Sequence, residues 1–312
     1  MTPCLRGFKY AIFADYLPRM YYVVYGLLYL FSLLPFWFMY LLSDGVYLLL
    51  YYVIKYRRDV VMANLAVAFP QKSEEERIKI AKEFYQSFVD QFIETIKMLS
   101  MSRKELDKRF TSNYHIVNDL YATGKNIQFH LGHSFNWEYA TLAFSANITY
   151  PLVTVYMPIQ NKIFNKIFYD MRSKFGGKLV AATDFRNEFR QYSRERYALA
   201  LVADQSPGGP EHAYWTNFFG RMTAFVPGPE KGAKLHNTAI IMAGIKKRKR
   251  GYYHCELKLL TMEPRSMPNG EITREMIQFI ENGIREQPSN YLWSHKRWKV
   301  PFDQDKFGHL VV

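Results

Sequence analysis

The chain has 312 residues, 49% of them hydrophobic and 17% aromatic, with 41 Lys and Arg against 28 Asp and Glu. This length can bury a full core, and the formal charge of +13 favours an anionic partner such as membrane phospholipid, a phosphorylated glycolipid or an acidic carrier protein. The two isolated cysteines, Cys4 and Cys255, argue against a disulfide framework and against a cysteine-based zinc site.

The first expected element is an apolar segment from Met20 to Ile54, in which Asp44 is the only charged residue. Its uncharged part, Met20 to Leu42, is long enough to span a hydrocarbon core of about 30 Å. No small-residue cleavage site follows the first apolar run, so the segment is not a removable signal peptide. We therefore expect residues 1–58 to form an N-terminal membrane anchor.

Breaks are predicted inside this anchor. Pro35 predicts a helix kink, and Ser43-Asp44-Gly45 predicts an interruption before Val46. Basic residues flank both ends of the segment, so charge gives no orientation. A spanning helix, a monotopic hairpin and a buried pair of core helices are all compatible with the sequence.

Two helices are expected after the anchor. Ser73 and Glu76 form the signature of a capping box, and apolar residues then recur at helical spacing as far as Leu99. Ser102 and Glu105 indicate the start of a second, shorter helix. Neither helix carries residues suited to catalysis.

From residue 127 onward, short apolar runs alternate with helical patterns. This alternation predicts an α/β fold over residues 59–312, with a mostly parallel central sheet covered by helices on both faces. Ligands bind at the carboxyl ends of strands in such sheets, where His133 and Asp204 fall. The expected strands are 127–131, 152–156, 197–203, 239–245 and 252–260, and the expected helices begin near residues 135, 162, 230 and 273.

A basic run, Lys246-Lys-Arg-Lys-Arg250, lies between the last two expected strands. On charge alone it would suit nucleic acid. However, the sequence contains no nucleic-acid-binding module, and such a run is typical of a solvated hairpin tip. We expect no nucleic-acid partner.

The stretch from Asn126 to Glu138 carries the most specific chemical pattern. A strand-like run breaks at Gly132 and leaves His133 five positions ahead of Glu138. Five residues turn about 140° past the starting face of a helix, so the two side chains meet only if His133 lies on the loop and Glu138 in the first helical turn. The imidazole would then act as a general base, with Glu138 accepting a hydrogen bond from its other ring nitrogen.

Other interpretations of these residues stay open at this point. His133 alone is compatible with a strand-end histidine that hydrogen-bonds the backbone, and His130 is a competing base inside the strand. A metal site formed by His130, His133 and Glu138 is a weaker alternative, because two histidines three apart across a strand end rarely converge.

Gly132-His-x-x-Asn-Trp-Glu138, in a basic chain with an apolar anchor, resembles the bacterial lipid A late acyltransferases, the lauroyl and myristoyl acyltransferases. The similarity extends from about Asp44 to Lys299. Further motifs follow in the family's order: Val155-Tyr-Met-Pro158 with Asn161, Arg172 near Phe175-Gly176, Asp204-Gln-Ser-Pro207, Phe218-Phe-Gly220, Phe225-Val-Pro-Gly-Pro-Glu230 and Tyr291-Leu-Trp-Ser-His-Lys-Arg-Trp298.

The resemblance implies a glycerol-phosphate-acyltransferase-like fold for the acyltransferase domain and an enzyme that transfers a fatty acyl chain to a hydroxyl of a lipid A precursor. The donor would be a thioester of acyl-carrier protein or of coenzyme A, and no metal or other cofactor is expected. It also implies a protein of the bacterial inner membrane, with its catalytic domain facing the cytoplasm.

The resemblance also implies roles for individual residues. His133 and Glu138 would be catalytic, and Arg172, Asp204, Gln205 and Asn136 would bind substrate. Arg172 suits phosphate, and Asp204 with Gln205 would orient the acceptor sugar or organise the base, although a solvated arginine and a turn aspartate explain the same residues. Asn136 can also cap the following helix.

Further assignments rest on aromatic and basic motifs. Phe218, Phe219 and Phe225 would line the acyl path or form ordinary core, and Arg297 with Lys299 would contact headgroups or form a solvated cluster. Met157 departs from the family, which usually has Arg after this Tyr. That departure keeps two alternatives open, the same chemistry on an aminolipid or glycolipid and a catalytically silent membrane scaffold; the intact His133 and Glu138 argue against the scaffold.

Overall fold

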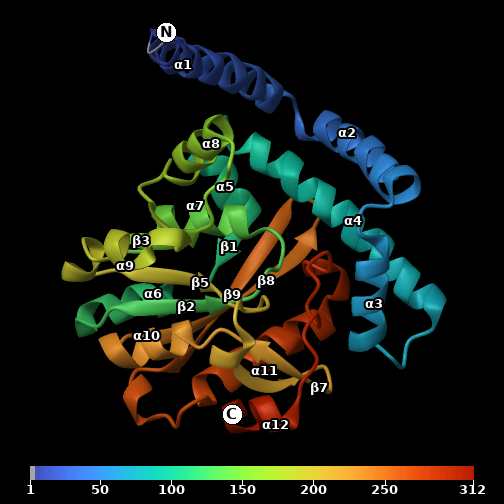
Figure 1. Cartoon of the computed structure of the whole chain (residues 1–312), viewed down its shortest axis with the longest axis vertical. Coiled ribbons are helices and arrows are strands. Elements are labelled where there is room, and N and C mark those ends of the chain that lie inside the picture. The colour runs from blue at the N-terminus through green and yellow to red at the C-terminus, as the bar shows by residue number, and fades with distance from the viewer. Residues whose placement is uncertain (1–3) are drawn as a thin grey trace.

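A computed structural model describes residues 4–312, with side chains placed from Arg19 onward; residues 1–3 of the predicted anchor lie outside it (Figure 1). A seven-stranded sheet in the order β1-β9-β8-β2-β5-β3-β4 forms the centre of the molecule. Neighbouring strands run parallel, except for the antiparallel hairpin of β8 and β9. The mostly parallel sheet is therefore confirmed. The strands are β1 (Phe110–Ser112), β2 (Ile127–Leu131), β3 (Leu152–Tyr156), β4 (Lys178–Ala181), β5 (Ala198–Val202), β8 (Ala239–Lys249) and β9 (Tyr252–Thr261).

Helices cover both faces of this sheet, as expected. Phe129 of β2 packs on Phe144 of one helix, α7, with ring centroids 5.0 Å apart, whereas the neighbouring residue Gln128 faces α10 near Gly232. The alternation of side chains along a strand explains why adjacent residues contact opposite helical layers. The helices of the domain are α3 (Arg58–Ala68), α4 (Glu74–Lys97), α5 (Arg103–Arg109), α6 (His115–Leu120), α7 (Trp137–Asn147), α8 (Lys162–Arg172), α9 (Phe185–Phe189), α10 (Gly228–His236), α11 (Glu271–Glu286) and α12 (Gln304–Phe307).

Strands β2 and β5 are neighbours in parallel register, with Leu131 opposite Val202. All five residues of β2 are buried, because the strand is paired on both edges and covered on both faces. The chain leaves the sheet at the same edge after each of these two strands. This register brings His133 and Asp204, which are 71 residues apart in the chain, to one place.

The helix starts predicted from capping signals are confirmed. Ser73 and Glu76 form a complete capping box at the start of α4, and the Ser102 side chain accepts a hydrogen bond from the Glu105 backbone at the start of α5. Strands β1 and β4 and the separate hairpin of β6 (Tyr214–Phe218) and β7 (Arg221–Phe225) were not predicted. Strands β1 and β4 have only three and four residues, and β6 and β7 mix polar and apolar residues instead of forming a continuous apolar run.

The N-terminal segment forms two helices that end and begin around Pro35: α1 (Cys4–Leu33) and α2 (Phe36–Leu48), the latter continued by a π-helix over Leu49–Ile54. The kink at Pro35 is confirmed, but the predicted break at Ser43-Asp44-Gly45 is wrong. The Ser43 hydroxyl donates to Asp90 at 2.7 Å and Arg250 donates to Asp44 at 2.6 Å, so the domain satisfies both polar side chains within a continuous helix.

The division at Pro35 also corrects the expected membrane-length helix. Met20 to Leu42 is shared between α1 and α2. Among the described residues, the one helix that is long and apolar enough to cross a membrane is instead Phe36–Ile54, with 19 residues and a mean hydropathy of 1.4.

Candidate active site

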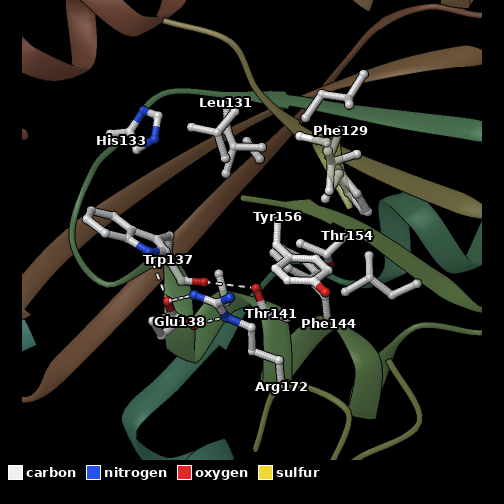
Figure 2. A pocket seen from close by; sticks show the side chains of 18 of the residues that line it. Phe129, Leu131, His133, Trp137, Glu138, Thr141, Phe144, Thr154, Tyr156 and Arg172 are labelled. Atoms are coloured by element: carbon white, nitrogen blue, oxygen red, sulfur yellow. Dashed lines mark hydrogen bonds and ion pairs between the residues drawn. The ribbon is translucent and has the colours of Figure 1, made fainter. Parts of the chain in front are cut away.

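A cavity of about 410 Å³ opens beside the carboxyl ends of β2, β3 and β5, against α7 and α8 (Figure 2). Its apolar walls come from the strands and from α7, and its polar groups include His133, Glu138, Arg172 and Gln205. The cavity thus combines a hydrophobic interior with a small set of ionisable groups. Its apolar lining includes Phe129, Leu131, Phe144, Leu152, Ala200 and Ala243.

His133 lies on the loop after β2, and its hydrogen-bond partner is Asp204 from the loop after β5. The ring nitrogen Nδ1 lies 2.5 Å from Asp204 Oδ1, and the backbone N–H of His133 donates to Oδ2 of the same carboxylate at 3.0 Å. Gly132 allows this approach, because a Cβ there would lie 3.3 Å from Asp204 Oδ2 and 3.0 Å from Ile280. The carboxylate therefore fixes both the ring and the backbone of His133.

Asp204 is fully buried, and burial alone would raise the pKa of its carboxyl group. The charge and the two hydrogen bonds of His133, with a hydrogen bond from the Tyr291 hydroxyl, instead lower that pKa to about 2. The side chain is ionised at neutral pH. An ionised carboxylate can only accept hydrogen bonds, so the ring carries its proton on Nδ1.

The other ring nitrogen, Nε2, is then the proton acceptor of His133. It lies 3.3 Å from Nε2 of Gln205, whose amide donates to it in this tautomer. Both His133 and Gln205 line the cavity. The unprotonated Nε2 of His133 thus lies at the edge of the apolar cavity. A hydroxyl group that replaced the Gln205 amide could hydrogen-bond to this nitrogen.

The predicted hydrogen bond between His133 and Glu138 is wrong. Glu138, in the first turn of α7, binds Arg172 of α8 through two hydrogen bonds of 2.8 and 2.5 Å, and the Trp137 indole N–H lies 3.3 Å from the same carboxylate. Figure 2 shows the Trp137 ring lying between His133 and the ion pair. The sequence pattern missed this arrangement because Asp204 and Arg172 reach the loop from distant parts of the chain.

Arg172 is not a solvated surface residue; it lines the cavity in an ion pair with Glu138, and its contact with phosphate stays a prediction. Burial lowers the pKa of its guanidinium, but the hydrogen bonds and charge of Glu138 outweigh that effect and raise it. Its side chain is 16% exposed and that of Glu138 is 6% exposed. The two residues form a largely buried ion pair in the cavity wall.

Asn136 does not reach the cavity as a substrate ligand. Its side chain is fully buried: the carbonyl oxygen accepts from the Tyr139 backbone at the start of α7, and the amide donates to Glu94 of α4 at 2.8 Å. Glu94 also accepts hydrogen bonds from Tyr40 of α2 and Tyr253 of β9. The capping role of Asn136 is confirmed, and its amide connects the loop that carries His133 to α4.

A C-terminal segment supports the His133 loop, a contact that the sequence did not predict. The Leu292 backbone N–H donates to the His133 carbonyl at 3.1 Å, and the Phe135 backbone N–H donates to Asn290 at 3.3 Å. Tyr291 lies between these contacts and its hydroxyl reaches Asp204. The motif beginning at Tyr291 was the available signal, but its place beside His133 depends on the tertiary fold.

Several other expected contacts are not present. Phe218, Phe219 and Phe225 do not line the cavity; they pack in a buried cluster with Trp293 and Trp298. These phenylalanines are ordinary core.

Arg297 is also buried, where it donates to the Ala224 carbonyl and lies over the Phe225 ring; this position excludes a headgroup contact, whereas Lys299 is exposed. The basic run from Lys246 to Arg250 forms the β8–β9 hairpin tip as predicted. Lys247 and Arg250 make ion pairs with Asp90 of α4, so the run is only partly solvated.

His130 is a packed residue, as its position in the strand suggested. Burial lowers the pKa of its ring to about 4, and Nε2 lies 3.0 Å from the Gln128 amide on the face of β2 opposite the cavity. Within the described part of the chain, no three His, Cys, Asp or Glu side chains group closely enough to hold a metal ion.

An apolar cavity with a carboxylate-held histidine at its edge is compatible with base-assisted acyl transfer. The family model for bacterial lipid A biosynthesis acyltransferases matches residues 14–300, and the chain belongs to that family. It is therefore an acyltransferase.

Curated relatives have the same family name. A lipid A biosynthesis acyltransferase of Haemophilus influenzae is 25% identical, covering 77% of this chain and 74% of its own length. Lipid A biosynthesis acyltransferase 2 of Shigella flexneri is 23% identical, with 76% of each chain covered. The lipid A biosynthesis myristoyltransferase of Escherichia coli is 21% identical, covering 79% of this chain and 76% of its own.

Proposed function

We propose that this protein transfers a fatty acyl chain from a thioester to a hydroxyl group of a lipid A precursor, with His133 as the general base. The observation that carries the proposal is the position of His133: Asp204 fixes its Nδ1, and its Nε2 faces a cavity with apolar walls. Nothing in this mechanism requires a serine or cysteine nucleophile.

In the proposed reaction, the acceptor hydroxyl replaces the Gln205 amide at Nε2 of His133 and attacks the thioester carbonyl. The proton moves to Nε2, and the ionised Asp204 stabilises the imidazolium that forms. When the tetrahedral intermediate collapses, the C–S bond breaks and the imidazolium returns the proton to the thiolate. The products are an ester and a free thiol, and His133 is again neutral.

The cavity is proposed as the site of the acyl chain. Its walls are mainly aliphatic and aromatic, and burying each methylene of a chain there would contribute about 0.8 kcal/mol. Glu138 and Arg172 are proposed to fix the polar side of this cavity and the start of α7 rather than to exchange a proton with His133. They act as positioning residues.

The acceptor assignment comes from the family and its curated relatives, and it is a proposal for this chain. Met157 lies at the cavity with 68% of its surface exposed, so an apolar thioether occupies a place where the family usually has a guanidinium. This favours, as a second candidate, the same reaction on a lipid with a less phosphorylated headgroup.

Acyl-carrier protein is the proposed donor, because an acidic carrier would be attracted to a chain with a net charge of +13; acyl-coenzyme A fits the same chemistry. We also propose residues 1–58 as a membrane anchor for an acyltransferase domain over residues 59–312, located at the bacterial inner membrane and facing the cytoplasm. The apolar helix Phe36–Ile54 supports this placement.

The test is acyl transfer by the purified full chain in detergent, with labelled acyl-carrier thioester or acyl-coenzyme A and a tetra-acylated lipid A precursor. We expect wild type to add one acyl chain and His133→Ala to add none, while Asp119→Asn, an exposed carboxylate on α6, behaves as wild type. Acylation of a different lipid would refute the acceptor, and transfer by His133→Ala at the wild-type rate would refute the base.

A further inference from the structure

Helix α2 and its π-helical extension have one buried and one exposed face. Met39, Ser43 and Tyr51 are buried, whereas Trp37 and Val53, near the two ends, are 70% and 71% exposed. The exposed side chains between them are also apolar, and they lie on the face that points away from α4. An exposed apolar surface of this extent is typical of a protein-binding or membrane-binding site.

The buried face of α2 lies along α4 over its whole length, with the two helices antiparallel. Tyr40 pairs with Glu94 at 2.9 Å, Ser43 with Asp90 at 2.7 Å, and the Tyr51 ring with Tyr85 at 5.3 Å between centroids. Residue numbers increase along α2 in the direction in which they decrease along α4. In Figure 1, α2 accordingly lies along the outside of the domain rather than projecting from it.

A polar network fixes this contact at its centre. Arg250, at the tip of the β8–β9 hairpin, binds Asp44 of α2 at 2.6 Å and Asp90 of α4 at 2.7 Å. Asp44 is the charged residue in the middle of the apolar helix. Its counter-charge therefore comes from the globular domain, not from another membrane segment.

These contacts do not allow α2 to cross a bilayer in this structure. A spanning α2 would take α4, with its buried Asp90 and Glu94, and the Arg250 hairpin tip into the hydrocarbon core. Charged side chains at the bilayer centre are costly, so the buried Asp90 and Glu94 oppose this position. Breaking the network instead would leave Asp44 unpaired in lipid.

We propose that α2 and its extension lie in the plane of the membrane interface, as a monotopic anchor that inserts its exposed face into an anionic phospholipid surface without spanning it. Lys55 and Arg58 at the end of the extension supply positive charge at headgroup level. The proposal refines the membrane association proposed above.

The second half of α1 has the same character. Leu27 and Leu30 are exposed on it, and Tyr21 donates to Asp170 of α8 at 2.8 Å. Figure 1 shows α1 beside α8 and α2 beside α4, along one side of the domain. Because α8 also carries Arg172 of the cavity wall, α1 contacts a helix that lines the cavity, and we propose that an acyl chain passes between lipid and cavity along this side.

Fluorescence quenching by brominated lipids tests this geometry without any assay of activity. The full chain is bound to vesicles of phosphatidylethanolamine and phosphatidylglycerol with bromine near the headgroup or near the end of the acyl chain. The Trp37→Phe variant keeps the other four tryptophans and gives the background signal. Its difference from wild type reports Trp37 at one end of α2, and Leu41→Trp, Leu48→Trp and Val53→Trp on this background report the rest of the helix. Leu235→Trp on the same Trp37→Phe background, at an exposed position of α10, is the matched control whose added fluorescence should not be quenched.

We expect all four positions to be quenched more strongly by the shallow bromine than by the deep one, with similar ratios. A depth that changes along the helix, with the middle position deepest, would show a spanning helix and overturn the inference while leaving membrane association intact. Absence of quenching at every position would overturn both.

Discussion

The loop after β5 and the first turn of α7 each bring a buried carboxylate to the cavity, but the two carboxylates differ in partner. Asp204, 71 residues from His133 in the chain, binds the imidazole, whereas Glu138, five residues away, binds Arg172. The difference arises because β2 and β5 are adjacent in register, while α7 turns Glu138 toward α8. Strand order, rather than spacing in the sequence, determines which carboxylate binds His133.

Asp204→Asn should have the largest effect on turnover. The amide can no longer stabilise an imidazolium and favours the wrong tautomer of His133, so we expect kcat to fall by about 10³-fold to 10⁴-fold. Acyl transfer under saturating donor measures this loss, and Asp119→Asn is the matched control. A fall of less than about tenfold would contradict the proposed pairing.

Glu138→Gln should act mainly on stability. It leaves the Arg172 guanidinium buried without a counter-charge, and we expect the free energy of unfolding to fall by about 3 kcal/mol. Urea denaturation measures the change, with Glu275→Gln as an exposed control.

The double variant Glu138→Gln, Arg172→Gln should recover part of this stability, because it removes the unpaired charge. If the losses of the two single variants simply add, the ion pair does not exist in solution.

The pairing of Asp204 should also be visible in the pH dependence of stability. The pKa of Asp204 is about 2 in the folded protein against an ordinary value of 3.8, so it contributes stability above about pH 4 that is lost as the pH falls toward 2. This contribution is about 2 kcal/mol. The difference in unfolding free energy between wild type and Asp204→Asn should therefore shrink through this range; a difference independent of pH would contradict the ionised state.

Tyr291→Phe should have the smallest effect. It removes one hydrogen bond to Asp204 but leaves both contacts of that carboxylate with His133, so we expect a cost of about 1 kcal/mol and a fall in kcat of about fivefold. The Tyr291→Phe substitution should also raise the pKa of Asp204, which is measured from acid unfolding curves. An unchanged acid transition would mean that Tyr291 only fills space.

The sequence predicted the parts of the fold that depend on local pattern. Strands β2 and β3 and the capping box of α4 lie where periodicity and Ser73 indicated, because these signals come from residues close in the chain. The break expected at Asp44 was wrong, because an ion pair with Arg250 replaces the missing apolar contact. A pattern of neighbouring residues in the sequence cannot reveal Arg250 as the partner of Asp44.

The same distinction applies to the site. His133 was found from its loop and motif, and Asp204 from its position after a strand. Their mutual contact required the order of β2 and β5 in the sheet, and the role of Asn136 required the buried Glu94 from α4. These are tertiary contacts between residues more than 40 positions apart, for which spacing carries no information.

The hydrogen bond between His133 and Asp204 is measured most directly by the NMR signal of the His133 ring proton on Nδ1. The full chain is labelled with ¹⁵N-histidine, and the signal is assigned with His133→Gln. A proton shared with a carboxylate at 2.5 Å should give a resonance far downfield. We expect this resonance to persist in Glu138→Gln and to disappear in Asp204→Asn. Loss of the signal in Glu138→Gln, with its retention in Asp204→Asn, would contradict the pairing of His133 with Asp204.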